Sequence, residues 1–314
     1  MKNNRFYTPS LFALFIVSLC YFPPSLANNI SLSYGTYQDT LTLGENNIEL
    51  DPSGTTIYTL FEATPEFSFS FNYGEFDDNA KIANASVLKL DATSWGAGVS
   101  YNWQAWLFSL DYGYAEEDIN INNTAREIKL YQEHYQAPSW SVSGAYGDFI
   151  SEGDSLWYWS LSGNVQYTDW ERNTERSLLS EPQLNTGKDA GDSWFSSLGL
   201  SLSQFYPTAF DSGFIYGGSL SWHHLITGES GIVSRNGRSI SQISTASSSL
   251  NARLSSSLNN SNFSQKIDGE HYGLASLFIG YDANEKFSVE LNVSTSLAAD
   301  TNAKSANISA SYQF

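Results

Sequence analysis

The stretch WLFSLDYGY, residues 106–114, alternates large apolar side chains with small or polar ones. Its even positions, from Trp106 to Tyr114, are aromatic or leucine, and Ser109, Asp111 and Gly113 lie between them. A period of two is typical of a β-strand with two different faces. The same period recurs at 67–73, 95–101, 157–167, 198–202 and 287–293. The sequence therefore predicts an all-β protein whose strands each have one apolar face.

The polar face separates the two all-β architectures that share this alternation. A soluble sandwich buries its apolar faces and needs charged residues outside, whereas a transmembrane barrel turns its apolar face to lipid. Here the polar face consists of Ser, Gly and Asn, and charged residues gather in EEDIN (116–120) and DWERNTER (169–176), which we expect to be connections. Aromatic residues at both strand ends predict the two girdles of a membrane barrel. One girdle is expected to contain Tyr101, Trp106, Trp157, Tyr206, Phe214, Tyr281, Phe287 and Phe314, and the other Trp140, Tyr167, Trp170, Trp194 and Trp222.

The pattern predicts about 12 antiparallel strands, within a range of about 10–14. Short connections alternate with long polar ones, as periplasmic turns alternate with external loops in bacterial barrels. An even strand number places both termini on the periplasmic side. We therefore predict a single transmembrane β-barrel, residues 28–314, in the bilayer of a Gram-negative outer membrane. The expected strand centres lie near residues 34, 59, 70, 97, 110, 142, 162, 200, 219, 277, 291 and 309, and the long connections around 115–133, 170–192 and 228–269.

Residues 1–27 have the features of a cleaved signal peptide. Lys2 and Arg5 precede a short apolar run at 11–20, and small residues at 25 and 27 fit a cleavage site. The run is shorter than the ~20 residues that a spanning helix needs. Cys20 is the only cysteine, so the mature chain is expected to contain no disulfide.

The charge balance excludes one class of partner. The chain has 33 acidic and 15 basic residues, a net charge of −18, and the basic residues form no cluster. A nucleic-acid-binding protein needs a basic patch. An aromatic content of 15% also excludes a disordered acidic chain.

The carboxyl end, Tyr312-Gln313-Phe314, resembles the aromatic-x-aromatic signal by which outer-membrane barrels are assembled. The resemblance implies that Tyr312 and Phe314 are an assembly signal and that the barrel-assembly machinery is a partner. A barrel of this size without large appended domains resembles the solitary autotransporter-type barrels, which are translocator-like but carry no secreted passenger. This implies a non-enzymatic protein with a polar lumen and long surface loops. No helix that would thread a translocator lumen is predicted at 28–50.

One residue pair suggests an outer-membrane hydrolase as a further alternative. Ser221 and His223 lie two residues apart on one expected strand, and a histidine beside a serine can act as its base. Leu220 and Trp222 occupy the lipid face of that strand, however, so the pair is expected to face the lumen, where a lipid substrate does not reach. We therefore predict no enzyme activity.

Metal and cofactor sites are not predicted. The acidic residues at 116–118 and 77–78 lack the spacing of a calcium loop and are interpreted as solvated charges. His134 and His271 are isolated in the sequence, and no set of metal-binding residues has the usual ligand spacing.

The lumen is expected to be lined by short polar side chains, which cannot fill a barrel of about 12 strands. Either water or a plug must then fill it. Asp111 and Glu290 are inward acids without an evident inward arginine, so a small-solute or cation-preferring channel is the main alternative function. The candidate lumen-lining residues are Asp111, Asn164, Ser201, Ser221, His223, Glu290 and Asn292.

Segment 229–268 is rich in Ser and Asn and allows three interpretations. It is a plug or cap of the lumen, a surface loop, or an additional pair of strands.

Overall fold

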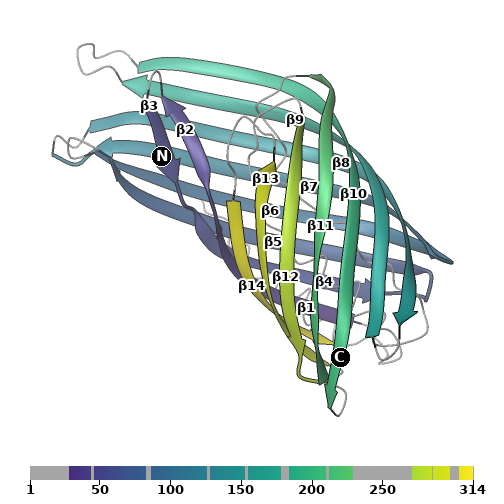
Figure 1. Ribbon diagram of the computed structural model, residues 1–314. Helices are drawn as coiled ribbons and strands as arrows, with labels where there is room; N and C mark the ends of the chain where they lie inside the picture. The colour runs from purple at the N-terminus through teal and green to yellow at the C-terminus, as the bar shows by residue number, and fades with distance from the viewer. Residues whose placement is uncertain are drawn as a thin grey trace.

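Twelve strands close into one antiparallel barrel in the computed structural model of the chain (Figure 1). The structure describes residues 28–313 except 44–45, 83–85, 126–127, 153–154, 178–183, 210–211, 229–270, 285 and 298–303. The predicted all-β barrel is confirmed, and each of the predicted strand centres lies within a different barrel strand. The barrel strands are β1 (Asn28–Tyr37), β4 (Ser53–Glu62), β5 (Phe67–Ile82), β6 (Ser86–Trp103), β7 (Trp106–Asn123), β8 (Ile128–Glu152), β9 (Ser155–Ser177), β10 (Leu184–Ala209), β11 (Ser212–Gly228), β12 (His271–Asp282), β13 (Phe287–Leu297) and β14 (Lys304–Gln313).

The barrel closes where its first strand meets its last. β1 pairs with β4 on one side and with β14 on the other, and Asn29 lies opposite Gln313. The two ends of the described chain therefore lie at the same rim, together with the short connections 63–66 and 104–105 and with residues 283–284 and 286. We call this edge the turn rim. Among the described residues, no helix is long and apolar enough to cross a membrane.

The outer surface carries an apolar band between two aromatic girdles. On β10 the outward residues run from Trp194 through Leu198, Leu200 and Leu202 to Tyr206, and each of these side chains is exposed. Twelve residues of strand at about 3.3 Å each, tilted by about 45°, rise about 28 Å, which matches a bilayer core of about 30 Å. Aromatic pairs on neighbouring strands build both girdles, such as Phe214 with Tyr281 at 5.1 Å and Tyr167 with Trp194 at 5.0 Å.

The prediction that Trp170 belongs to an aromatic girdle is wrong. Its side chain is only 3% exposed and packs inside with Tyr135 and Ala137, because it lies on the inward-facing side of β9. Tyr167, three residues earlier on the opposite face, takes the girdle position.

We call the girdle that contains Tyr167 and Trp194, away from the turn rim, the upper girdle. The six strands β5 to β10 continue past it as a tall sheet, which we call the wall (Figure 1). The predicted loops around 115–133 and 170–192 are therefore wrong, since most of these residues are strand. The two faces exchange polarity there: Ile119 and Ile121 are buried on the inward side, and Glu116 and Asp118 point outward. Charged side chains on the outer face of the wall can be exposed to water, as leucine side chains on the outer face of the barrel can be exposed to lipid. The strands therefore continue from the barrel into the wall without a break. The wall consists of residues 74–82, 86–94, 115–123, 128–138, 168–177 and 184–193.

A hairpin missed by the sequence analysis lies beside the wall. β2 (Asp39–Leu43) and β3 (Asn46–Leu50) lie in the sequence between β1 and β4, and they pair only with each other as a two-stranded sheet. Leu50 at the end of β3 is buried with Tyr37, Phe76 and Leu88 in one apolar cluster. The inward face of the wall is thus a packed core of the kind found in soluble proteins.

Candidate functional site

The predicted lumen residues all lie on the inner face of the barrel. Asp111, Ser201, Glu290 and Asn292 are buried, and Asn164, Ser221 and His223 are partly buried. Of the predicted assembly signal, Tyr312 points outward and pairs with Ile30 and Phe287 at the turn rim. Phe314, the predicted signal peptide 1–27 and the segment 229–268 lie outside the described residues.

Several inward serines bond to one another in pairs. Strand register places serines opposite each other on neighbouring strands, and their hydroxyls form hydrogen bonds along the inner surface. A hydroxyl that is satisfied in this way no longer needs a solute as partner. The pairs are Ser109–Ser143 (2.5 Å), Ser160–Ser201 (2.5 Å), Ser219–Ser276 (2.7 Å), Ser294–Ser305 (2.6 Å) and Ser31–Ser311 (3.0 Å).

An apolar cluster inside the barrel was not predicted. We call it the inner belt, and it contains Leu107, Ala145, Tyr158, Phe205, Ile215 and Phe278, all buried, from six consecutive strands. The sequence does not show that Tyr158 points inward, because its two neighbours, Trp157 and Trp159 on the outer face, are also aromatic. The belt places hydrophobic side chains inside the barrel, where an apolar constriction excludes water and ions.

Glu290 lies in an unusual polar group on β13 and β14. Its side chain is 4% exposed, and neither carboxylate oxygen has a hydrogen-bond partner among the residues that the structure describes. Asn292, two residues along the same face, lies directly opposite Asn307, and both amides contain buried atoms without a partner in the described part of the barrel. Burying an unpaired charge is costly, so a proton, a water molecule or a cation must satisfy Glu290.

The serine–histidine pair is present but lacks a third group. Ser221 Oγ and His223 Nε2 are 3.0 Å apart, and the imidazole stacks on Tyr272 with ring centres 4.6 Å apart. A serine nucleophile needs its base oriented by a further group. Within the described part of the chain, no such hydrogen bond to His223 is found.

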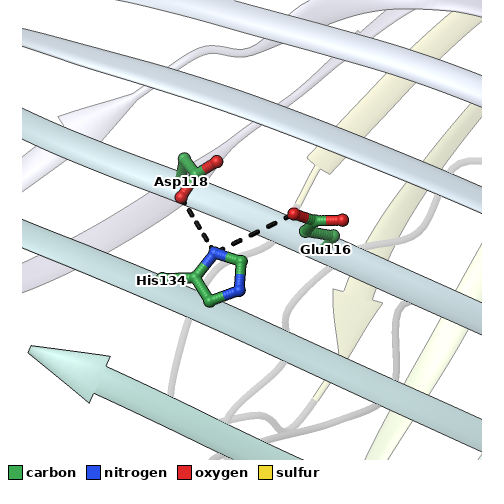
Figure 2. Close-up of side chains that lie close together, drawn as sticks. All are labelled: Glu116, Asp118 and His134. Carbon is green, nitrogen blue, oxygen red and sulfur yellow. Dashed lines mark hydrogen bonds and ion pairs between the residues drawn. The ribbon is translucent and has the colours of Figure 1, made fainter. Parts of the chain in front are cut away.

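The outer face of the wall brings His134 next to Glu116 and Asp118 (Figure 2). Glu116 and Asp118 lie two residues apart on β7, and His134 lies directly opposite Asp118 on β8. The His134 Nδ1 atom is 2.9 Å from Asp118 Oδ1 and 3.9 Å from Glu116 Oε1. We call these residues the His134 cluster.

The interpretation of His134 and His271 as isolated is therefore wrong. His271 Nδ1 is 2.7 Å from His224 Nδ1 on the neighbouring strand, and the two rings stack. Both contacts depend on cross-strand register, which the local sequence does not show. Glu117, between Glu116 and Asp118, points inward and is 3% exposed, so the acidic run is divided between two faces.

Two lysines on the outer face of the wall pair with other acids. Lys89 pairs with Asp91 at 2.5 Å, and Lys188 pairs with Glu171 at 2.8 Å. The hydrogen bonds from Lys188 and Asn173 lower the pKa of the Glu171 carboxyl below its ordinary value. Both pairs lie on the same face as the His134 cluster.

Comparison with solved structures identifies the class of fold. The chain is similar to the translocator domain of the autotransporter NalP from Neisseria meningitidis, with a TM-score of 0.62, 10% identity, and coverage of 97% of this chain and 94% of that one. It is also similar to the β domain of the Bordetella autotransporter Brka, with a TM-score of 0.55, 11% identity, and coverage of 92% and 99%. For the transport unit of the autotransporter AIDA-I from Escherichia coli, the TM-score is 0.51, the identity 12%, and the coverage 96% and 94%. No family profile matches the sequence, and no curated protein matches it.

The chain thus has the fold of a Gram-negative outer-membrane β-barrel. Within that class its closed twelve-stranded barrel is similar in fold to autotransporter translocator domains. At these identities the similarity establishes the fold.

Proposed function

We propose that this protein is a non-enzymatic outer-membrane barrel of the autotransporter type, closed to solutes, that holds the wall at the cell surface. The observation that carries the proposal is the exchange of polarity above the upper girdle. A sheet with a packed apolar core on one side and charged side chains on the other has the composition of a soluble protein surface, not of a lipid-facing one. The barrel and its wall are together the functional unit.

The composition of the interior supports a closed state. Serine pairs on neighbouring strands bond to each other, and the inner belt lies inside the barrel. No charged ring comparable to a porin constriction faces the inside in the membrane-spanning part of the described strands. The purified full-length protein is expected to give no conductance steps in a planar bilayer, with folding verified by a gel shift on heating. Large, open-channel steps would refute the closed state.

A narrow cation-selective channel is the second candidate, because Glu290 is an inward acid without a hydrogen-bond partner among the described residues. If the barrel conducts, Glu290→Gln is expected to reduce its preference for K⁺ over Cl⁻, since an inward carboxylate attracts cations. Ser288→Gln, on the same face of β13, is the matched control. Equal selectivity in both variants would remove this candidate.

The orientation of the barrel is the next prediction. We expect the turn rim to face the periplasm, so that the wall stands outside the cell. A cysteine at Ala125, an exposed residue between β7 and β8, is expected to react with a membrane-impermeant maleimide on intact cells. A cysteine at Ala283, exposed at the turn rim, should react only after the outer membrane is permeabilised. The reverse pattern would invert the proposed orientation.

The closing strand also supports a proposal about assembly. Tyr312 on β14 points outward at the turn rim and lies opposite Phe287. This position is expected of a strand that the assembly machinery recognises. Deleting Phe314 is expected to lower the amount of folded protein in the outer membrane several-fold and to leave unfolded chain in the periplasm. An unchanged amount would show that Phe314 is not part of an assembly signal. Refolding of the purified variant in detergent separates a recognition defect from a loss of stability.

A further inference from the structure

The His134 cluster has the composition and spacing of a metal site. One oxygen each from Glu116 and Asp118 and one nitrogen of His134 lie within 4.8 Å of one another. A tetrahedral zinc ion with bonds of about 2.0–2.2 Å holds its ligand atoms about 3.3–3.6 Å apart. The observed separations of 2.9 Å and 3.9 Å from His134 Nδ1 lie on either side of that value. Small rotations of the side chains are enough to close the group around an ion.

The backbone fixes the three residues relative to one another. Asp118 and His134 are directly opposite in the β7–β8 ladder, and Glu116 is the next residue on the same face of β7. On its other side, His134 lies opposite Asn173 of β9. Each ligand is thus carried by a strand that has neighbours on both sides. A rigid frame reduces the entropy lost when a ligand binds.

The charges around the cluster leave it without a basic partner. The nearby lysines pair with Asp91 and Glu171, and no ion pair between a lysine or arginine and Glu116 or Asp118 occurs among the described residues. With a neutral imidazole, the two carboxylates give the cluster a formal charge of −2. A divalent cation would balance this charge. Protonation of His134 alone would balance only half of it.

We infer that Glu116, Asp118 and His134 form a binding site for a divalent transition metal of the zinc class. The imidazole decides the class of metal, because nitrogen ligands suit Zn²⁺ and its neighbours, whereas Ca²⁺ and Mg²⁺ prefer sites made of oxygen alone. Three protein ligands leave at least one coordination position open, and it points away from the barrel. On β7 the cluster begins at Glu116, the next outward residue after Tyr114, so the ion would sit just above the upper girdle.

Zinc titration of the purified barrel, prepared without a histidine tag and followed by calorimetry, tests the inference. We expect one Zn²⁺ per barrel, unaffected by an excess of Ca²⁺ or Mg²⁺. His134→Gln and Asp118→Asn are each expected to weaken the affinity by more than about tenfold, because each removes a ligand. The gel shift on heating confirms that both variants are folded, and their loss of stabilisation by Zn²⁺ in thermal unfolding provides a second measurement.

The His224–His271 pair supplies the matched control, since its imidazoles also lie on the outer face. His224→Gln is expected to leave zinc binding unchanged. Zinc binding that survives in His134→Gln and disappears in His224→Gln would overturn the inference and move the site to the histidine pair. Absence of zinc binding to the folded wild-type protein, or equal binding of Ca²⁺, would also overturn it.

Discussion

Replacing Leu200 with arginine is expected to lower the free energy of unfolding by about 2–4 kcal/mol, because a charge at the bilayer midplane loses its hydration. Leu200 points outward, halfway along β10 between Trp194 and Tyr206. Urea unfolding in lipid vesicles, followed by tryptophan fluorescence, measures the change. A smaller folded fraction in cells should accompany it.

Thr93→Arg is the control for this prediction. Thr93 is exposed on the outer face of the wall, opposite Glu116 and one step beyond Trp95. Arginine there is expected to cost less than about 1 kcal/mol, since the cost falls toward the interface. Equal costs at the two positions would contradict the placement of the apolar band.

Phe278→Ala is expected to destabilise the barrel by about 3–5 kcal/mol, the usual cost of removing a packed aromatic ring. The ring is buried in the inner belt with Phe205 and Ile215. Because neighbouring strands hold the surrounding side chains, the space left behind is expected to admit water and ions. Conductance steps in a planar bilayer should therefore appear in this variant, and chemical unfolding measures the loss of stability.

Phe69→Ala provides the comparison, because Phe69 points outward and is 49% exposed. Lipid chains fill the space, so the loss is limited to the transfer free energy of the ring, about 1.5–3 kcal/mol. No conductance is expected. Silence from both variants, with folding confirmed, would show that the inner belt does not close the interior.

The sequence predicted the barrel because the signal for a strand is local. Alternation such as that from Trp106 to Tyr114 identifies a strand and its lipid face without knowledge of its partners. The upper ends of the strands were missed for a physical reason. Where Glu116 and Asp118 replace aromatic residues on the outer face, the segment resembles a loop, although Ile119 and Ile121 continue the period on the inner face. Attention to both faces would have found the wall.

Predicting the inner belt and the His134 cluster would require the register between strands. Asp118 and His134 are separated by 16 positions in the sequence and meet only because β7 and β8 pair in one particular alignment. Phe205 and Phe278 come from strands that are not neighbours, yet both are buried in one cluster. No pattern within a single strand contains such information.

The unequal strand lengths give the cylinder a preferred place to open. β1 and β14, with 10 residues each, pair only from Asn29–Gln313 to Tyr37–Ser305. On the opposite side, β8 and β9 pair from Tyr131–Arg176 to Glu152–Ser155. Lipid offers no replacement for a lost backbone hydrogen bond, so the work of separating two strands increases with the length of their ladder. The ladders of β1 with β4 and of β13 with β14 are equally short. The sheet should therefore part first under load, and form last during folding, in the region around the seam between the first and last strands, while the long ladders opposite keep it in one piece.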